Sequence, residues 1–131
     1  MEVTLLTFDG PIDEFPALIQ TADTLVADGV RRLGIDLPEL PFINSAALGY
    51  LVDLQRRLGK EDGLLALSRL QPAIVNILQM TRLDQFLAFF DSTEEAISYL
   101  GGDPDEPVGQ AEDLGSSLSR QHWRGKRAET A

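Results

Sequence analysis

Short runs of strand-forming apolar residues alternate with longer segments of helical periodicity over the first hundred residues of the chain. Strands are expected at residues 3–8, 33–37, 64–67 and 86–90. Helices are expected at about residues 16–28 and 45–58, from Pro72 onward, and at about residues 92–100. Because strands joined through helices usually run in parallel, this order predicts an α/β fold with a mixed, mostly parallel sheet of about four to five strands packed against about four helices.

The composition of the chain changes near residue 101. The chain has 131 residues, which suffices for one domain with a core. From residue 102 onward the sequence has little apolar content and no clean periodicity, and its charge changes from acidic to basic. Such a segment buries too little apolar surface to offset the entropy lost on ordering. We therefore expect one domain over residues 1–101 and a disordered tail over residues 102–131.

The charge and the absence of cysteine exclude several classes of protein. The formal net charge is -10, from 21 acidic and 11 basic residues. This balance argues against nucleic acid and anionic membranes as main partners, because both attract clustered Lys and Arg. Without cysteine there are no disulfides and no thiolate chemistry. The first residues do not resemble a signal peptide and no apolar run is long enough to span a bilayer, so a cytoplasmic location is expected.

Little in the sequence is typical of an active site. The single histidine, His122, lies in the expected tail, where nothing would orient it as a base. No glycine-rich phosphate loop with a following Lys is present. Asp9, Asp13 and Glu14 would admit a divalent cation, but their spacing matches no metal loop, and a solvated surface is the favoured interpretation. No catalytic residue, metal ligand or cofactor is therefore expected.

The expected tail contains one short aromatic and basic tract. His122 and Trp123 lie beside Arg124, Lys126 and Arg127. A Trp among basic residues can dock on a partner or on nucleic acid. The alternative, a disordered end that carries one aromatic residue, is favoured because such short tracts are not specific.

The segment from Pro41 to Gly59, PFINSAALGYLVDLQRRLG, leads from an apolar run through Asn44 and Ser45 into an amphipathic helix. Either Asn44 or Ser45 can cap this helix by accepting a hydrogen bond from a backbone N–H two or three residues on. Alternatively, Ser45 is a phosphoacceptor. A phosphate there would be stabilised by the free N–H groups and the dipole of the helix. It would add a charge of about -1.5 to -2, which a partner with acidic or apolar facing groups would not tolerate.

Two motifs follow one another at a set spacing along the chain. Residues 44–49 read NSAALG at the start of the second helix, and residues 80–83 read MTRL before the expected strand at 86–90 and the last helix. Over about residues 3–101, this order resembles the bacterial anti-sigma factor antagonists of the STAS domain family. Members of that family carry an Asp-Ser-Ser-Gly-Leu-Gly type turn and a Met-Ser/Thr-Gly-Leu type turn at these places. The resemblance implies a STAS-like form of the α/β fold.

The resemblance also implies a partner-switching role without enzymatic activity. The unphosphorylated protein would bind an anti-sigma factor, often also a serine kinase, and so free the sigma factor. Ser45 matches the phosphoacceptor: its phosphorylation would break the complex and a phosphatase would restore it. The kinase would hold ATP and magnesium, so the chain itself would need no cofactor. The implied partner-binding residues are Asn44, Ser45, Ala46, Tyr50, Asp53 and Arg57.

The turn departs from the family pattern at three positions. Asn44 replaces the usual acidic residue, Ala46 replaces the second serine, and Ala47 replaces a glycine, which restricts the backbone if that position needs a positive φ. These departures leave a second interpretation open: a STAS scaffold or accessory subunit of a stress-signalling complex or of a lipid or anion transport system, without phosphorylation. A third, a small enzyme or ligand-binding α/β domain, has the least support in the sequence.

Overall fold

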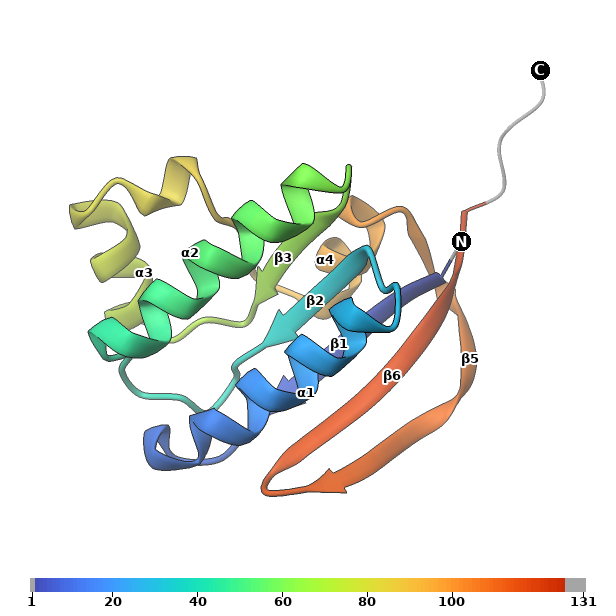
Figure 1. Cartoon of the computed structure of the whole chain (residues 1–131), viewed down its shortest axis with the longest axis horizontal. Coiled ribbons are helices and arrows are strands. Elements are labelled where there is room, and N and C mark those ends of the chain that lie inside the picture. Colours follow the sequence, from blue (N-terminus) through green and yellow to red (C-terminus); the bar gives the residue numbers. More distant parts are fainter. Residues whose placement is uncertain (1, 127–131) are drawn as a thin grey trace.

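The computed structural model describes residues 2–126, which form a sheet with helices on both of its faces (Figure 1). In chain order the elements are β1 (Glu2–Phe8), the 3-10 turn η1 (Ile12–Glu14), α1 (Phe15–Ala27), β2 (Arg32–Asp36), α2 (Ser45–Lys60), β3 (Leu64–Ser68), α3 (Pro72–Met80), the 3-10 turn η2 (Leu83–Gln85), β4 (Ala88–Phe90), α4 (Thr93–Tyr99), β5 (Gly102–Gly115) and β6 (Leu118–Gly125).

The six strands lie in the order β4-β3-β2-β1-β6-β5. The four strands β1 to β4 are parallel to their neighbours, with helices as the connections between them. β6 pairs antiparallel with β1, and β5 pairs antiparallel with β6. The α/β fold with a mostly parallel sheet is thus confirmed, with six strands where about four to five were predicted.

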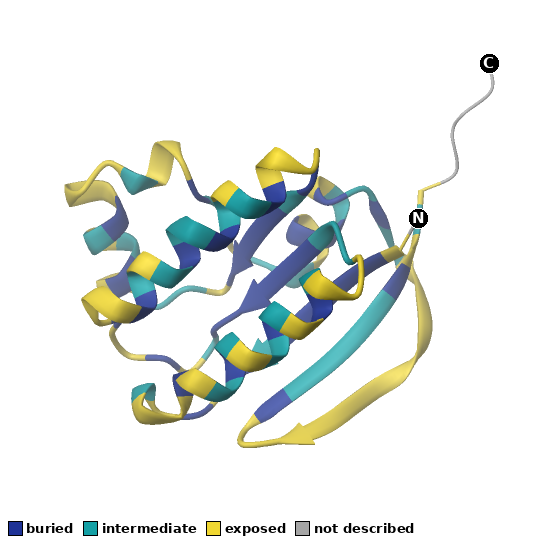
Figure 2. Cartoon of the chain, viewed as in Figure 1, coloured by how far each residue is buried: buried dark blue, intermediate teal, exposed yellow. Residues whose placement is uncertain are grey.

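Two hydrophobic cores lie on opposite faces of the sheet. The larger core joins the sheet to α1, α2 and α3, and the smaller joins it to α4, which lies behind the sheet in Figure 1. Leu33, Ile35 and Leu37 alternate along β2 and its end, and all three belong to the larger core, as their spacing predicted. Figure 2 shows the result: the central strands are buried and the outer helix surfaces are exposed.

The eight elements predicted within the first hundred residues are all present, with small differences in their bounds. The fourth strand begins at Ala88, two residues after the expected residue 86. Phe86 and Leu87 instead donate their backbone N–H groups to the Leu83 carbonyl, which keeps them in the turn after α3. Ser92 caps α4 by accepting a hydrogen bond from the Glu95 N–H, and the Ser92 hydroxyl also bonds to the Glu95 carboxylate.

The prediction of a disordered tail is wrong for residues 102–126. Gly101, with a φ of +91°, ends α4 and turns the chain back toward the sheet. A Cβ on Gly102 would lie 2.9 Å from atoms of both Val3 and Ile97, so a glycine is required where β5 begins. β6 then bonds along the whole of β1, which would otherwise be an open edge. Residues 127–131, among them Arg127, lie outside the described residues.

Trp123 and His122 are accordingly part of the sheet. Trp123 is 8% exposed and packs in the smaller core, opposite Val3. His122 lies on β6 opposite Thr4, and its Nδ1 is 2.8 Å from the Thr4 hydroxyl. The tract is therefore neither a docking segment in a tail nor a disordered end, because the Trp123 ring packs in the smaller core.

We expect Trp123→Ala to lower the free energy of unfolding by about 3 kcal/mol or more, since it leaves a cavity against Val3 and α4. Arg124→Ala, at the exposed next position, should change it by less than about 0.5 kcal/mol. Urea unfolding of both variants makes the measurement. Equal stability of Trp123→Ala and wild type would mean that this segment is the disordered tail after all.

Candidate protein-interaction surface

The amino-terminal end of α2 presents Ser45 to solvent. Asn44 has an extended backbone, and its Oδ1 accepts a hydrogen bond of 2.8 Å from the Ala47 N–H. Asn44, and not Ser45, is therefore the cap, and Ser45 is the first helical residue. Asn44, Ser45 and Ala46 are all exposed. Ala47 is buried inside the helix without a positive φ, so the alanine causes no backbone strain there.

The loop that leads to Ser45 is held at several points. Leu37, Leu40 and Ile43 are buried in the larger core. The Leu37 N–H donates to the Ser68 carbonyl at 3.1 Å, and the Gln71 side chain donates to the Pro38 carbonyl. Because both its apolar side chains and its backbone are anchored, the loop places the start of α2 at a fixed position relative to the sheet.

A buried carboxylate fixes the point where this loop leaves the sheet. Asp36 is 0% exposed, and it accepts hydrogen bonds from the hydroxyls of Thr7 and Ser68 at 3.0 and 2.9 Å. Arg69 donates to both carboxylate oxygens, with 2.9 Å from its Nε to Oδ1. This hydrogen bonding raises the pKa of Arg69 above its ordinary value. Arg69 adopts a left-handed backbone conformation, with a φ of +53°.

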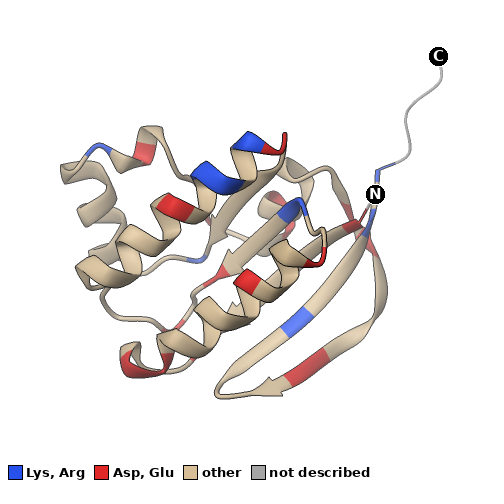
Figure 3. Cartoon of the chain, in the orientation of Figure 1, with Lys and Arg blue, Asp and Glu red and all other residues tan. Residues whose placement is uncertain are grey.

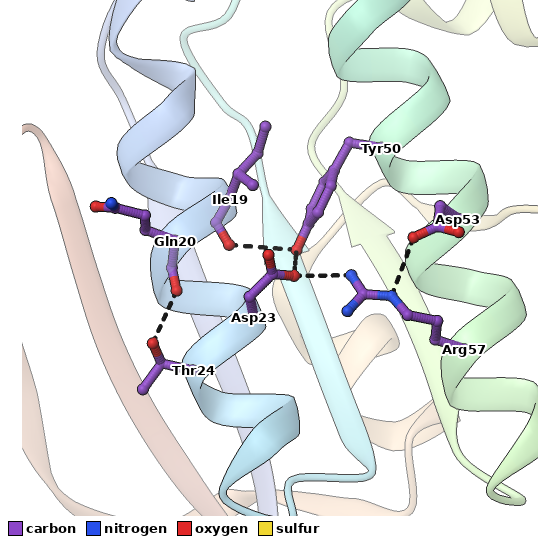
Figure 4. Close-up of polar contacts among 7 residues, drawn as sticks. All are labelled: Ile19, Gln20, Asp23, Thr24, Tyr50, Asp53 and Arg57. Atoms are coloured by element: carbon purple, nitrogen blue, oxygen red, sulfur yellow. Dashed lines mark hydrogen bonds and ion pairs between the residues drawn. The ribbon is translucent and has the colours of Figure 1, made fainter.

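Three further predicted contact residues lie along the seam between α1 and α2 (Figure 4). The Tyr50 hydroxyl is 2.7 Å from Asp23 Oδ1 and 3.3 Å from the Ile19 carbonyl. Arg57 donates to the same Asp23 oxygen at 2.7 Å, and its Nε lies 3.0 Å from Asp53. Tyr50 and Arg57 thus point toward α1 and are half-buried, whereas Asn44, Ser45 and Ala46 form the open part of the predicted surface.

Asp23, like Arg69 and Asp36, was not predicted from the sequence as part of this region. It lies on α1 one turn after Ile19, at the edge of the apolar stripe of that helix. Burial alone would raise its pKa, but hydrogen bonds from Arg57 and Tyr50 outweigh this effect and lower the pKa below the ordinary value. Burial and the Asp23 hydrogen bond raise the pKa of Tyr50 far above that of a free tyrosine, so Tyr50 stays protonated. The seam thereby fixes α1 against α2.

A small hollow opens between the starts of α1 and α2, beside Ser45. We call it the notch. Its volume is about 220 Å³, and it is lined by Ile12, Asp13, Phe15, Pro16, Ile19, Asn44, Ala46 and Ala47. Six of these eight residues are apolar, and Asp13 and Asn44 contribute the polar groups.

Two other predicted features can be placed. Asp9, Asp13 and Glu14 are exposed, and within residues 2–126 no three His, Cys, Asp or Glu side chains are grouped so as to share a metal ion. No helix in the same range has the length and hydropathy needed to cross a membrane.

A family model of the STAS domain matches residues 2–96. The chain belongs to the STAS domain family. The match ends before β5, so the strands that close the β1 edge lie outside the part of this STAS protein that the family model describes.

Solved structures agree with this assignment. An anti-sigma factor antagonist from Mycobacterium paratuberculosis is 26% identical, with a TM-score of 0.65 over 76% of this chain and 94% of the other. An anti-sigma-factor antagonist (STAS) domain protein from Planctomyces limnophilus is 24% identical, with a TM-score of 0.65 over 75% of this chain and 90% of the other. The family and the fold are thus shown together.

Arg69→Ala should destabilise the protein by about 2–3 kcal/mol, because it removes two hydrogen bonds from a buried carboxylate. Arg56→Ala, on the exposed side of α2, is the matched control and should be nearly neutral. Thermal unfolding measures the stability of both variants. Equal losses of stability would show that the lost contact with Asp36 does not cause the destabilisation of Arg69→Ala.

Asp23→Asn should lower the free energy of unfolding by at most about 1 kcal/mol at neutral pH, since the pair with Arg57 is partly exposed. The pKa of Asp23 is lower folded than unfolded, so this contribution is complete above a pH of about 4 and is lost as the pH falls through the folded pKa. Urea unfolding over that pH range should show the gap to wild type closing. This role would be contradicted if the difference in free energy of unfolding between Asp23→Asn and wild type persisted in acid. It would also be contradicted if Asp28→Asn, at the exposed end of α1, showed an equal difference.

Proposed function

We propose that this STAS protein is an anti-sigma factor antagonist that binds an anti-sigma factor with serine kinase activity and is released when Ser45 is phosphorylated. The observation that carries the proposal is the state of Ser45 itself. It is exposed on the first turn of α2, and Asn44 takes over the capping role. The Ser45 hydroxyl is thus free to accept a phosphate without loss of the helix cap.

The geometry supports a switch that acts on binding and not on folding. α2 has 16 residues, and its dipole and free N–H groups favour a negative charge at its start. A phosphate of about -1.5 to -2 charge would therefore be tolerated by the folded chain. For a partner that rests on the same surface, the phosphate would have to be desolvated, which is costly. The kinase site of the partner would hold ATP and magnesium, so the chain itself would catalyse nothing. A phosphatase in the cytoplasm would remove the phosphate.

The contact surface in this proposal is the exposed turn of Asn44, Ser45 and Ala46, with the outer side of α2 beside it. Tyr50 and Arg57 would contribute mainly by holding α2 in place, since both are bonded to α1. The Asp53 side chain is 51% exposed, more than those of Arg57 and Asp23, so Asp53 is the charged member of the seam best placed to touch a partner.

Asn44 in place of an acidic residue favours one alternative, a STAS scaffold or accessory subunit that uses the same fold without phosphorylation. The two functions differ in what happens at Ser45. A stable complex with a transporter subunit that is indifferent to Ser45 would support the alternative.

The test compares the intact mass and the partner affinity of wild type, Ser45→Ala and Ser45→Asp. With the serine kinase partner and ATP, wild type should gain one phosphate and Ser45→Ala none. Ser45→Asp should bind the partner about tenfold more weakly or worse, a loss of about 1.4 kcal/mol. Ser116→Asp adds the same charge in the exposed β5–β6 turn and should bind like wild type. Wild-type affinity for Ser45→Asp would contradict the switch.

A further inference from the structure

The notch and the charges around it indicate what kind of side chain the partner brings to this surface. Its volume of about 220 Å³ is below the range of about 300–1,000 Å³ that is usual for small-molecule sites. Its walls are mostly apolar, with Ile12, Phe15 and Ile19 on one side and Ala46 and Ala47 on the other. A cavity of this size and polarity suits one aliphatic or aromatic side chain.

The segments that form the notch are acidic. Arg69 is a cation that interacts with one of these acids, Glu39, but its guanidinium is already bonded to the buried Asp36 carboxylate. Residues 1–30 and 33–55 include no Lys or Arg. Asp13 lines the notch, and Glu14 and Glu39 are exposed nearby in sequence. Figure 3 shows the same asymmetry, with acidic positions at η1 and the basic positions of α2 confined to its far half. This pattern is complementary to a basic group.

We infer that the notch receives a single apolar anchor residue of the partner protein, flanked by a Lys or Arg that lies against Asp13. This inference rests on the proposed function for the identity of the partner, and it adds how the partner is recognised. The anchor supplies the buried apolar area that usually dominates an interface, while the basic neighbour sets its orientation at the rim.

The same arrangement explains how a phosphate on Ser45 acts. Ser45 does not itself line the notch, but it lies between Asn44 and Ala46, which both do. A phosphate on Ser45 would stand outside the notch at its rim, and it would lose solvent when a partner covers that rim. The basic flanking residue faces Asp13 on the opposite wall, so it does not offset that cost.

Three acetylated, amidated pentapeptides test the site without the partner: Gly-Lys-Leu-Lys-Gly, Gly-Glu-Leu-Glu-Gly and Gly-Lys-Ser-Lys-Gly. Amide chemical shifts of the full-length protein are followed as each is added at low salt. The Lys-Leu-Lys peptide should cause saturable shifts centred on Ile19, Asn44 and Ala46, and it should bind several-fold more tightly than the other two. Absence of such shifts, or equal binding of the Glu-flanked peptide, would overturn the inference.

Two variants locate the effect. Ala46→Trp should fill the mouth of the notch and abolish the shifts, while Asp13→Lys should weaken binding of the Lys-flanked peptide by about three- to tenfold and reduce its salt dependence. Asp28→Lys makes the same charge change at the other end of α1 and should have no effect. Unchanged binding by both notch variants would also overturn the inference.

The peptide result is independent of the proposed function. If the peptides do not bind but the partner still binds in a Ser45-dependent way, the notch is disproved as a docking site and the proposed switch stands. Peptide binding together with wild-type affinity of Ser45→Asp for the kinase partner would instead remove the switch and leave the notch as a docking site.

Discussion

The Asp36 carboxylate is buried at the carboxyl end of β2, where Thr7 from β1, Ser68 from β3 and the Arg69 guanidinium hold it with four hydrogen bonds. These contacts join three parallel strands at the edge from which the loop to Ser45 departs. A carboxylate without such partners would be costly at 0% exposure. The network therefore fixes the register of the strand ends, and through Leu37 and Pro38 it fixes the path of the loop. The position of the proposed interaction surface thus depends on the Asp36 contacts.

A second constraint acts along the helices. The Asp23 carboxylate lies between Tyr50 and Arg57 and joins α1 to α2, so the two walls of the notch belong to helices that are bonded to each other. The surface around Ser45 is thus presented by rigid elements, which lowers the entropy that a partner must remove on binding. In the proposed switch, a phosphate on Ser45 would therefore change the affinity for the partner without a change of fold.

Much of this structure was predictable from local patterns, and the rest was not for identifiable reasons. The periodicity of apolar residues and the turn residues between them located the elements up to Gly101. This worked because each of these segments buries one face, which leaves a regular apolar pattern in the sequence. β5 and β6 were not predicted because they are stabilised by pairing with the open edge of β1 more than by burial of apolar side chains. Of β6 only Leu118 and Trp123 are buried. The prolines and carboxylates that made residues 102–115 look disordered suit an outer strand. Pro104 and Pro107 remove donors, and the irregular register discourages pairing with another chain. Ser45 was found from the helix start, but Asp23 and Arg69 act across helices and strands whose packing no single segment encodes.

In the proposed function, a protein partner docks over the start of α2 and the notch beside it. Hydrogen exchange of the full-length protein, free and bound to the anti-sigma kinase, tests this most directly. We expect new protection from exchange over about residues 12–19 and 42–50, with β5 and β6 unchanged. Protection confined to α4 or to the β5–β6 strands, with none at the start of α2, would contradict it.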